Sequence, residues 1–181
     1  ADQVIEHIVA RAKSLRLGIG SDAEMGPLIS AAQRQRVLGY FDSARADGMT
    51  CLAGGEAVSG PGHYVQPTVL TGDVAQARVL EEEIFGPVLC VTRFDDEDLA
   101  GIAAKVNATP YGLSANIWTR DISKALGLAR LIQSGSVRIN GGTGYDMAVP
   151  FGGYKQSGIG RENGGEGVKA YTELKAVTVA L

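Results

Sequence analysis

Three consecutive acidic residues precede an aromatic residue and a Gly-Pro pair in the segment from Glu81 to Pro87. An ionised carboxylate such as that of Glu83 is a double acceptor, which suits two adjacent hydroxyls of a ribose. The ring of Phe85 can cover one face of a nicotinamide, and alternation along an extended segment predicts both side chains on one side. Taken alone, the segment fits a solvated acidic run before a buried phenylalanine better, because Glu is usually exposed and Phe usually buried.

A second candidate is the glycine-rich segment from Pro150 to Glu162, with the sequence Pro-Phe-Gly-Gly-Tyr-Lys-Gln-Ser-Gly-Ile-Gly-Arg-Glu. Glycines at this density permit backbone conformations and close approaches that a Cβ would resist, so the segment predicts a shaped loop. A tight crossing of backbones without any ligand explains it equally well. A phosphate-binding loop is excluded, because no Gly-x-Gly-x-x-Gly motif follows a strand and opens a helix here.

Two polar side chains, Gln33 and Arg36, lie about one turn apart on a predicted helix. By themselves they are typical of a solvated helix face. The two cysteines, Cys51 and Cys90, lie in apolar, strand-like runs and in no Cys-x-x-Cys or mixed Cys/His spacing. We therefore predict that both cysteines are buried, inert packing residues, and we expect no metal site or disulfide.

The composition is that of an ordinary globular protein, since 45% of the 181 residues are hydrophobic and 20% are charged. A net charge of -3 and a sequence pI near 5.4 give no basic surface for a phosphate backbone, which argues against nucleic acid as a ligand. No run approaches the roughly 20 apolar residues of a membrane span. No signal peptide is evident, so we expect a cytoplasmic protein. Because the chain opens at Ala1 in a helical pattern without a methionine, we expect that a natural N-terminal portion is missing.

Hydrophobic periodicity predicts helices alternating with strands. The helices are expected at 3–17, at 30–47 with a reciprocal Ser30–Gln33 capping box, at 99–106 after a cap at Asp95 or Asp96, at 121–134 after a cap at Asp121, and at 164–172. The strands are expected at 49–52, 64–70, 88–94, 113–118, 136–139 and 174–181. This alternation predicts an α/β fold, with one three-layer αβα domain over 1–172 and a mainly parallel sheet. The apolar C-terminal strand within 173–181 needs a partner, which predicts pairing between subunits of a homo-oligomer, a dimer or tetramer.

Taken together and in order, these segments resemble the aldehyde dehydrogenase superfamily over essentially the whole chain. Any one match is weak, but their joint occurrence is specific, and it reverses the separate interpretations above. The matching stretches include Met25-Gly26-Pro27-Leu28, Gln66-Pro67-Thr68-Val69, Glu82 to Pro87, Asn107 to Leu113, Val137 to Asn140, and Pro150 to Glu162.

The resemblance implies roles for particular residues at the cofactor, which would be NAD or NADP. Glu83 matches the family glutamate that binds the nicotinamide-ribose hydroxyls, and Phe85 matches the aromatic residue beside the nicotinamide. Gln33 and Arg36 fall where the family has a glutamine and usually a lysine near the cofactor ribose. Arginine at position 36 departs from that pattern, because the two cations differ in shape and hydration.

The resemblance also implies roles at the aldehyde substrate. Phe151 matches an aromatic residue of the entry funnel, and Tyr145 and Met147 lie in the family's variable substrate loop. Glu162 matches a glutamate proposed to relay protons during hydrolysis of the acyl-enzyme. The nucleophile of the family is a cysteine in a Gly-Gln-x-Cys-like motif that would precede this chain, as would the general-base glutamate, the oxyanion-stabilising asparagine and the dinucleotide-binding domain.

The resemblance therefore implies part of an NAD(P)-dependent enzyme that oxidises an aldehyde to a carboxylic acid through a cysteine thioester, with this chain inactive alone. One alternative is a stand-alone, non-catalytic domain of the same fold that serves assembly or small-molecule binding. Another is an acyl-phosphate reductase of the same fold. The Glu-x-Phe pair and the Gly-Gly-Tyr-Lys loop favour the aldehyde-oxidising enzymes over this reductase.

Overall fold

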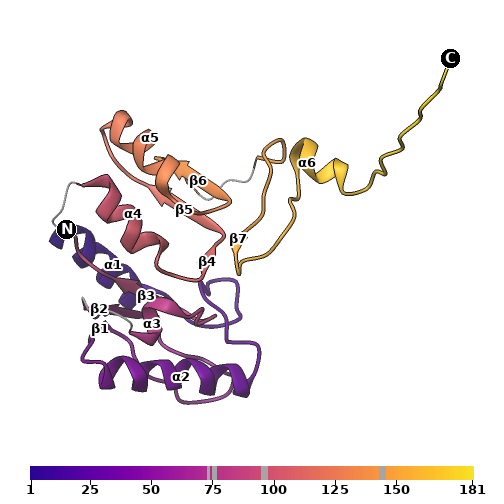
Figure 1. Ribbon diagram of the computed structural model, residues 1–181. Helices are drawn as coiled ribbons and strands as arrows, with labels where there is room; N and C mark the ends of the chain where they lie inside the picture. Colours follow the sequence, from indigo (N-terminus) through magenta and orange to yellow (C-terminus); the bar gives the residue numbers. More distant parts are fainter. Residues whose placement is uncertain (73, 75–76, 95–97, 143–145) are drawn as a thin grey trace. The chain divides into compact units, whose positions relative to one another are not determined.

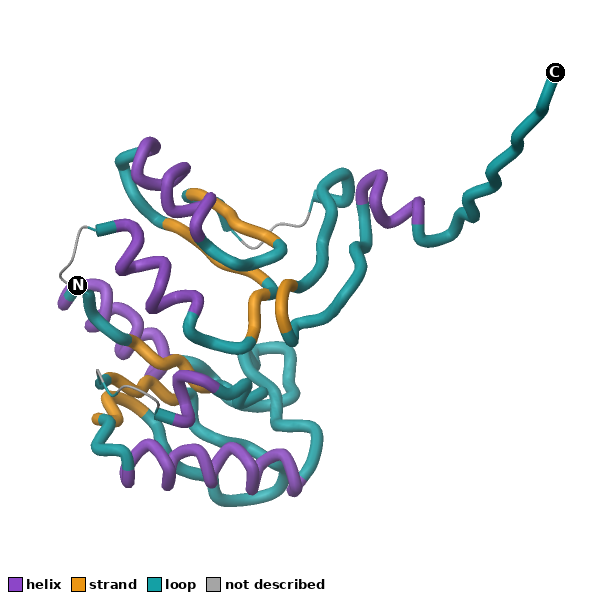
Figure 2. Tube along the Cα trace, in the orientation of Figure 1, coloured by secondary structure: helices purple, strands orange, loops and turns teal. Residues whose placement is uncertain are grey.

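A computed structural model describes residues 1–181 apart from 73, 75–76, 95–97 and 143–145. The chain forms two compact units, Ala1–Asp95 and Asp96–Leu181. Each unit contains both helices and strands (Figure 2), so the predicted α/β class is confirmed. Within the described residues, no helix combines the length and the apolar character that crossing a membrane requires.

The first unit is a three-stranded sheet with helices on both faces (Figure 1). Its elements are α1 (Asp2–Ser14), α2 (Ala31–Ala46), β1 (Thr50–Ala53), β2 (Thr68–Thr71), α3 (Arg78–Glu81) and β3 (Val88–Val91). The strand order is β1-β2-β3, and β2 pairs antiparallel with β1 and parallel with β3. Helix α1 lies on one side of the sheet and α2 with α3 on the other, which explains why adjacent Val69 and Leu70 of β2 are both buried.

A buried stripe along α2 forms the core on its side of the sheet. Val37, Tyr40, Phe41 and Ala44 recur at the spacing of one helical face and are at most 2% exposed. Tyr40 and Ala44 join Leu70 of β2 in one apolar cluster. Each large side chain buried in this way contributes about 1.5–3 kcal/mol. This burial fixes α2 on the sheet. It therefore also fixes the backbone positions from which the polar side chains of α2 extend.

The predicted cap of α2 is confirmed on one side only. Ser30 Oγ accepts a hydrogen bond from the Gln33 backbone N–H at 3.1 Å, and Gly48 follows the helix with φ 80°. The reciprocal hydrogen bond from the Ser30 backbone N–H to the Gln33 side-chain oxygen is not formed between these two described residues, and the Gln33 amide Nε2 donates to the carbonyls of Ile84 and Phe85. A long-range contact has replaced the local one.

Helix α1 ends earlier than predicted, at Ser14, because Leu15 takes an extended conformation with φ -64° and ψ 124°. The loop that follows folds back on the helix through Glu24. Its carboxylate accepts hydrogen bonds from the Arg11 guanidinium at 2.8 Å and from the Arg16 backbone N–H at 3.1 Å. The hydrogen bond from Arg11 and then the one from Arg16 lower the pKa of Glu24 below its usual 4.5.

The second unit contains α4 (Leu99–Asn107), β4 (Tyr111–Gly112), β5 (Ser114–Ile117), α5 (Ile122–Leu131), β6 (Ser136–Ile139), β7 (Tyr154–Lys155) and α6 (Gly164–Lys169). Strands β5 and β6 are parallel, with α5 as the connection, and this crossover was predicted. Asp121 caps α5 as expected, since its Oδ1 accepts the Lys124 backbone N–H at 3.0 Å. Ile117, Ala125 and Ile132 form the buried core between helix and strands.

In the second unit one local prediction is corrected, and one strand pair was not predicted. The cap of α4 is Asp98, which accepts the backbone N–H groups of Ala100 and Gly101, rather than Asp95 or Asp96, which lie outside the described residues. The antiparallel pair of β4 with β7 was not predicted. A strand of two residues leaves no alternation in the sequence, so periodicity alone does not reveal it.

The sheets are mixed rather than mainly parallel. Among the described residues, β1–β2 and β4–β7 run antiparallel, while β2–β3 and β5–β6 run parallel. Residues 170–181 are exposed and form no strand in the structure, so the strand predicted at 174–181 is not confirmed. An extended segment needs a neighbouring strand to bond its backbone, and no described strand pairs with this one.

Candidate functional site

Two side chains of α2 hold the backbone of the predicted cofactor-binding segment. The Gln33 amide Nε2 donates to the carbonyl of Ile84 at 3.1 Å and to that of Phe85 at 3.0 Å. Almost one turn further along the helix, Arg36 Nη2 donates to the Glu83 carbonyl at 3.4 Å. The first unit therefore brings together the four residues predicted for the cofactor site, Gln33, Arg36, Glu83 and Phe85.

Phe85 has an uncommon backbone conformation for a residue with a side chain. Its φ is 56°, in the left-handed region, which costs an L-residue about 1–2 kcal/mol. Its side chain is 75% exposed, so the burial suggested by residue type alone is wrong. The left-handed turn also breaks the extended alternation that predicted Glu83 and Phe85 on one side. Strained, exposed residues held in place by their surroundings are typical of functional sites.

The carboxylate of Glu83 is exposed and makes no hydrogen bond or ion pair with any described residue. Its main chain, in contrast, is engaged by Arg36. A Cβ on the nearby Gly86 would stand 2.7 Å from Cγ2 of Val37, so glycine lets the backbone pack directly on α2 there. The segment is thus fixed through its backbone, while its carboxylate and its ring remain accessible.

The preceding residue, Glu82, is anchored from two elements. Tyr40 Oη donates to Glu82 Oε2 at 2.8 Å, and Arg78 Nε of α3 donates to the same oxygen at 3.0 Å. The Arg78 guanidinium also lies over the Tyr40 ring, 4.4 Å from its centroid. The hydrogen bonds from Arg78 and then Tyr40 lower the pKa of Glu82 below its usual 4.5, so this carboxylate is ionised at neutral pH.

Sequence reasoning missed this cluster of Tyr40, Arg78 and Glu82. The one available signal was Tyr40 itself, because a tyrosine in a buried helical stripe needs a partner for its hydroxyl. Which acidic residue of the Glu81–Glu83 run supplies that partner depends on the tertiary structure, and the sequence pattern does not specify it.

In the second unit, two residues predicted for substrate chemistry pair through their backbones. The Phe151 N–H donates to the Glu162 carbonyl at 2.8 Å, and the Glu162 N–H donates back to the Phe151 carbonyl at 2.7 Å. Phe151 lines a cavity of about 300 Å³ together with Arg138, Asp146, Asn163 and neighbouring residues. The Glu162 side chain is exposed.

The variable loop predicted to touch the substrate is only partly described. Met147 is 69% exposed, and its carbonyl accepts the Gly164 backbone N–H at 2.9 Å, beside the Phe151–Glu162 pair. Tyr145 lies outside the described residues.

Several residues of the glycine-rich loop have structural roles. A Cβ on Gly135 would collide with the Gly152 carbonyl oxygen, so the two backbones touch directly. Lys155 Nζ donates to the carbonyls of Asn107 at 3.1 Å and Thr109 at 2.6 Å, which satisfies acceptors at the end of α4. The interpretation as a tight backbone crossing therefore holds for this part of the loop.

The two cysteines differ from each other. Cys90 is partly buried and packs against the apolar cluster of the first unit, and this burial raises the pKa of its thiol, which disfavours the reactive thiolate. Cys51 is exposed, so the prediction that it is buried is wrong. It lies at the antiparallel edge strand β1, where its Sγ donates to the carbonyls of Ala53 and Gly54.

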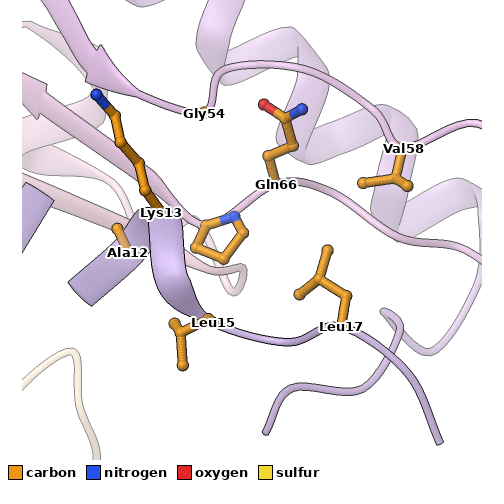
Figure 3. Close-up of a pocket in the computed structure, with 8 residues that line it drawn as sticks. Ala12, Lys13, Leu15, Leu17, Gly54, Val58 and Gln66 are labelled. Atoms are coloured by element: carbon orange, nitrogen blue, oxygen red, sulfur yellow. The ribbon is translucent and has the colours of Figure 1, made fainter. Parts of the chain in front are cut away.

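A further pocket of about 300 Å³ opens beside the C-terminal end of α1 (Figure 3). The polar ends of Lys13 and Gln66 lie toward one side of it, and the apolar side chains of Leu15, Leu17 and Val58 toward the other. None of the predicted site residues lines this pocket. Its wall is partly polar and partly apolar, and the pocket is separate from the four residues gathered around Phe85.

The fold and these groups of side chains are those of an α/β protein with candidate sites built from loops on a rigid scaffold. Residues 1–177 match the sequence profile described as "Aldehyde dehydrogenase family". The chain belongs to the aldehyde dehydrogenase family.

Individual relatives agree with this assignment. The chain is 42% identical over 180 residues to a betaine aldehyde dehydrogenase of Cereibacter sphaeroides and 39% identical over 181 residues to a mitochondrial aldehyde dehydrogenase of Leishmania tarentolae. These matches cover 98% and 99% of this chain but 37% and 36% of the two relatives. Among solved structures, the NAD+ complex of an aldehyde dehydrogenase from Bacillus cereus is similar, with a TM-score of 0.92, 40% identity, and coverage of 97% of this chain and 36% of that one. The chain therefore spans little more than a third of the length of its relatives.

Proposed function

We propose that this chain is the C-terminal part of an NAD(P)-dependent aldehyde dehydrogenase and supplies contacts to the nicotinamide ribose and to the aldehyde. The observation that supports this most directly is the way α2 holds residues 82–85. Gln33 and Arg36 bind three consecutive carbonyls, of Glu83, Ile84 and Phe85, and leave the Glu83 carboxylate and the Phe85 ring accessible.

The residues present fit a dinucleotide. An exposed carboxylate without a protein partner can accept hydrogen bonds from both ribose hydroxyls, and an exposed ring can pack on one face of the nicotinamide. Gln33 and Arg36 border this site from α2 and contribute to it through the backbone that they hold. When bound, NAD or NADP would accept the hydride that the oxidation of an aldehyde releases.

On the substrate side, Phe151 would form an apolar wall for the aldehyde, with Met147 and Tyr145 of the preceding loop nearby in sequence. Glu162, paired with Phe151 through the backbone, would relay a proton during thioester hydrolysis. A cysteine thiolate outside this chain would attack the aldehyde carbon, hydride would leave to the cofactor, and water would hydrolyse the resulting thioester to a carboxylic acid. This chain would contribute positioning rather than the nucleophile.

The proposal is tested by substitutions in the full-length enzyme. We expect Glu83→Gln to raise the KM for the dinucleotide by about tenfold, because a hydrogen bond to a charged group is worth roughly 1.5–3 kcal/mol. The KM for the aldehyde should change little. Phe151→Ala should show the reverse split. Glu56→Gln, at an exposed glutamate after β1, is the control for loss of a surface charge. An unchanged dinucleotide KM in Glu83→Gln would refute the proposed role of Glu83.

The isolated 181-residue chain gives a second test. It should show no turnover of short aldehydes with either NAD or NADP, because burial raises the pKa of the Cys90 thiol, and the Cys51 thiol, although exposed, donates to the carbonyls of Ala53 and Gly54. Turnover that is abolished by Cys90→Ala would show that this assignment of Cys90 is wrong.

A further inference from the structure

Glu82 is the first residue of the proposed cofactor-binding segment, residues 82–85. Its carboxylate is held by hydrogen bonds from other elements of the first unit. Donors from α2 and α3 converge on one of its oxygens, Oε2: the hydroxyl of Tyr40 at 2.8 Å and the guanidinium of Arg78 at 3.0 Å. Tyr40 is fully buried, so the position of its hydroxyl is set by the core of the first unit. Glu82 is therefore tied to the rigid part of the unit.

This anchor continues directly into the backbone contacts described above. After the side chain of Glu82, the next three carbonyls accept hydrogen bonds from α2, that of Glu83 from Arg36 and those of Ile84 and Phe85 from Gln33. Every residue from 82 to 85 is thus bound to a helix by either its side chain or its carbonyl. In this run the Glu83 carboxylate and the Phe85 ring remain unengaged by hydrogen bonds to described residues.

We propose that Glu82 is a positioning residue for dinucleotide binding, acting through the neighbouring Glu83. This inference rests on the proposed function, because Glu83 needs a ribose to bind. A carboxylate on a loose loop must be ordered when the ligand binds, and that ordering weakens affinity. Anchoring the residue immediately before Glu83 removes much of this cost in advance, so the anchor contributes to cofactor affinity without touching the cofactor.

The matching experiment replaces Glu82 by glutamine in the full-length enzyme. Glutamine keeps the size of the side chain but loses the charge that Arg78 and Tyr40 bind. We expect the Kd of NAD or NADP, measured by titration calorimetry in the absence of aldehyde, and the KM for the dinucleotide both to rise by about threefold to tenfold. The kcat should change by less than about twofold and the aldehyde KM should be unchanged. Asp42→Asn is the matched control, because Asp42 of α2 also pairs with an arginine, Arg45 at 2.8 Å, but makes no hydrogen bond or ion pair with residues 82–85.

A double-mutant cycle separates positioning from general stability. If Glu82 acts through Glu83, adding Glu82→Gln to Glu83→Gln should raise the dinucleotide KM by no more than about a further 1.5-fold. A merely structural role would give the same additional rise in both backgrounds, together with a changed aldehyde KM, and that result would overturn the inference. Tyr40→Phe removes the hydroxyl that donates to Glu82 and that also accepts a hydrogen bond from Arg36 at 3.3 Å. This variant should show at least the KM effect of Glu82→Gln, so the inference can still be refuted if Glu82→Gln does not fold.

The outcomes also distinguish this inference from the function on which it rests. If Glu83→Gln raises the dinucleotide KM while Glu82→Gln and Tyr40→Phe leave it unchanged, the role of Glu82 is wrong and the proposed function stands. If Glu83→Gln itself has no effect, the proposed function is wrong and the inference about Glu82 is wrong with it.

Discussion

The fold leaves the ring of Phe85 and the carboxylate of Glu83 accessible to solvent, whereas the backbone of the same segment is held by hydrogen bonds. Sequence patterns alone favour Gln33 and Arg36 as part of a solvated helix face. In the structure they donate hydrogen bonds to backbone carbonyls of residues 83–85. Phe85, which residue type favours as buried, is exposed at a left-handed φ. The polar side chains of α2 therefore hold the segment, while the apolar ring of Phe85 is exposed to solvent. This is the reverse of the usual preference, in which apolar side chains are buried and polar ones exposed.

The strain at Phe85 gives a prediction about stability. Phe85→Gly should be more stable than Phe85→Ala by about 1 kcal/mol, because only glycine adopts a φ of 56° without steric cost. Both variants lose the exposed ring, so their difference isolates the backbone. Urea unfolding of the two variants measures it. Equal midpoints would mean that the backbone of residue 85 is not held in the left-handed region.

Glu24 gives a prediction about pH. The hydrogen bonds from Arg11 and Arg16 lower its pKa in the folded protein below the usual 4.5. The stabilisation is therefore present above about pH 4.5 and is lost as the pH falls through the lower, folded-state pKa. Glu24→Gln should unfold at lower urea concentration than the parent at neutral pH, and the gap should shrink in acid. Glu6→Gln on α1 controls for a lost charge, and a gap that widens in acid would contradict the assignment.

At the scale of elements, the sequence was most informative where local chemistry decides the outcome. The cap at Asp121, the parallel crossover through α5 and the strand Ser136–Ile139 all follow from side chains within a few residues of each other. The failures arise where a distant partner decides. Helix α1 ends at Ser14 because Glu24 draws the following loop back, and β4 exists because β7 pairs with it. Neither partner is visible in a local window.

Two glycines test how tightly the elements are packed. A Cβ on Gly135, just before β6, would collide with the Gly152 carbonyl oxygen, so Gly135→Ala should destabilise the chain by about 1–3 kcal/mol. Gly39 lies inside α2, and apart from its chain neighbours and the backbone of its own helix no heavy atom of the described residues lies within 4 Å of the position a Cβ would take. Gly39→Ala should therefore stabilise the chain by about 0.5–1 kcal/mol through helix propensity. Thermal or urea unfolding measures both changes, and a neutral Gly135→Ala would disprove the close crossing.

At the scale of the whole chain, the site illustrates what one sequence can and cannot specify. Glu83, Phe85, Gln33 and Arg36 were chosen by resemblance, and the structure gathers them in one unit. The anchor at Glu82 was missed because three successive glutamates are equivalent in pattern, and the hydrogen bonds from Tyr40 and Arg78 that distinguish Glu82 arise only in the folded unit. The sequence pattern identifies the segment from Glu81 to Pro87, and the packing of Tyr40 and Arg78 determines that Glu82 is the anchored glutamate.

The C-terminal tail gives the last prediction. Its apolar residues are almost fully exposed within one copy of the chain, with Leu174 at 103%, Val177 at 77%, Val179 at 75% and Leu181 at 121%. Such a segment gains nothing from its own chain, so at a protein concentration too low for assembly, removing 174–181 should leave the urea midpoint unchanged. It gains backbone bonds and apolar burial by adding to a sheet of another subunit, so we propose that it serves as an oligomerisation strand.

Light scattering at rising protein concentration measures this assembly. The intact chain should increase in mass with concentration, whereas the shortened chain should stay a monomer. Val177→Asp keeps the length of the tail while placing a charge within it, and should weaken assembly in the same way. If the intact and shortened chains have the same mass at every concentration, the tail is not an assembly strand. A lower urea midpoint in the shortened chain, measured at a concentration where both chains are monomers, would instead show that the tail packs on its own chain, because exposed residues removed from a monomer cost no folded-state contacts.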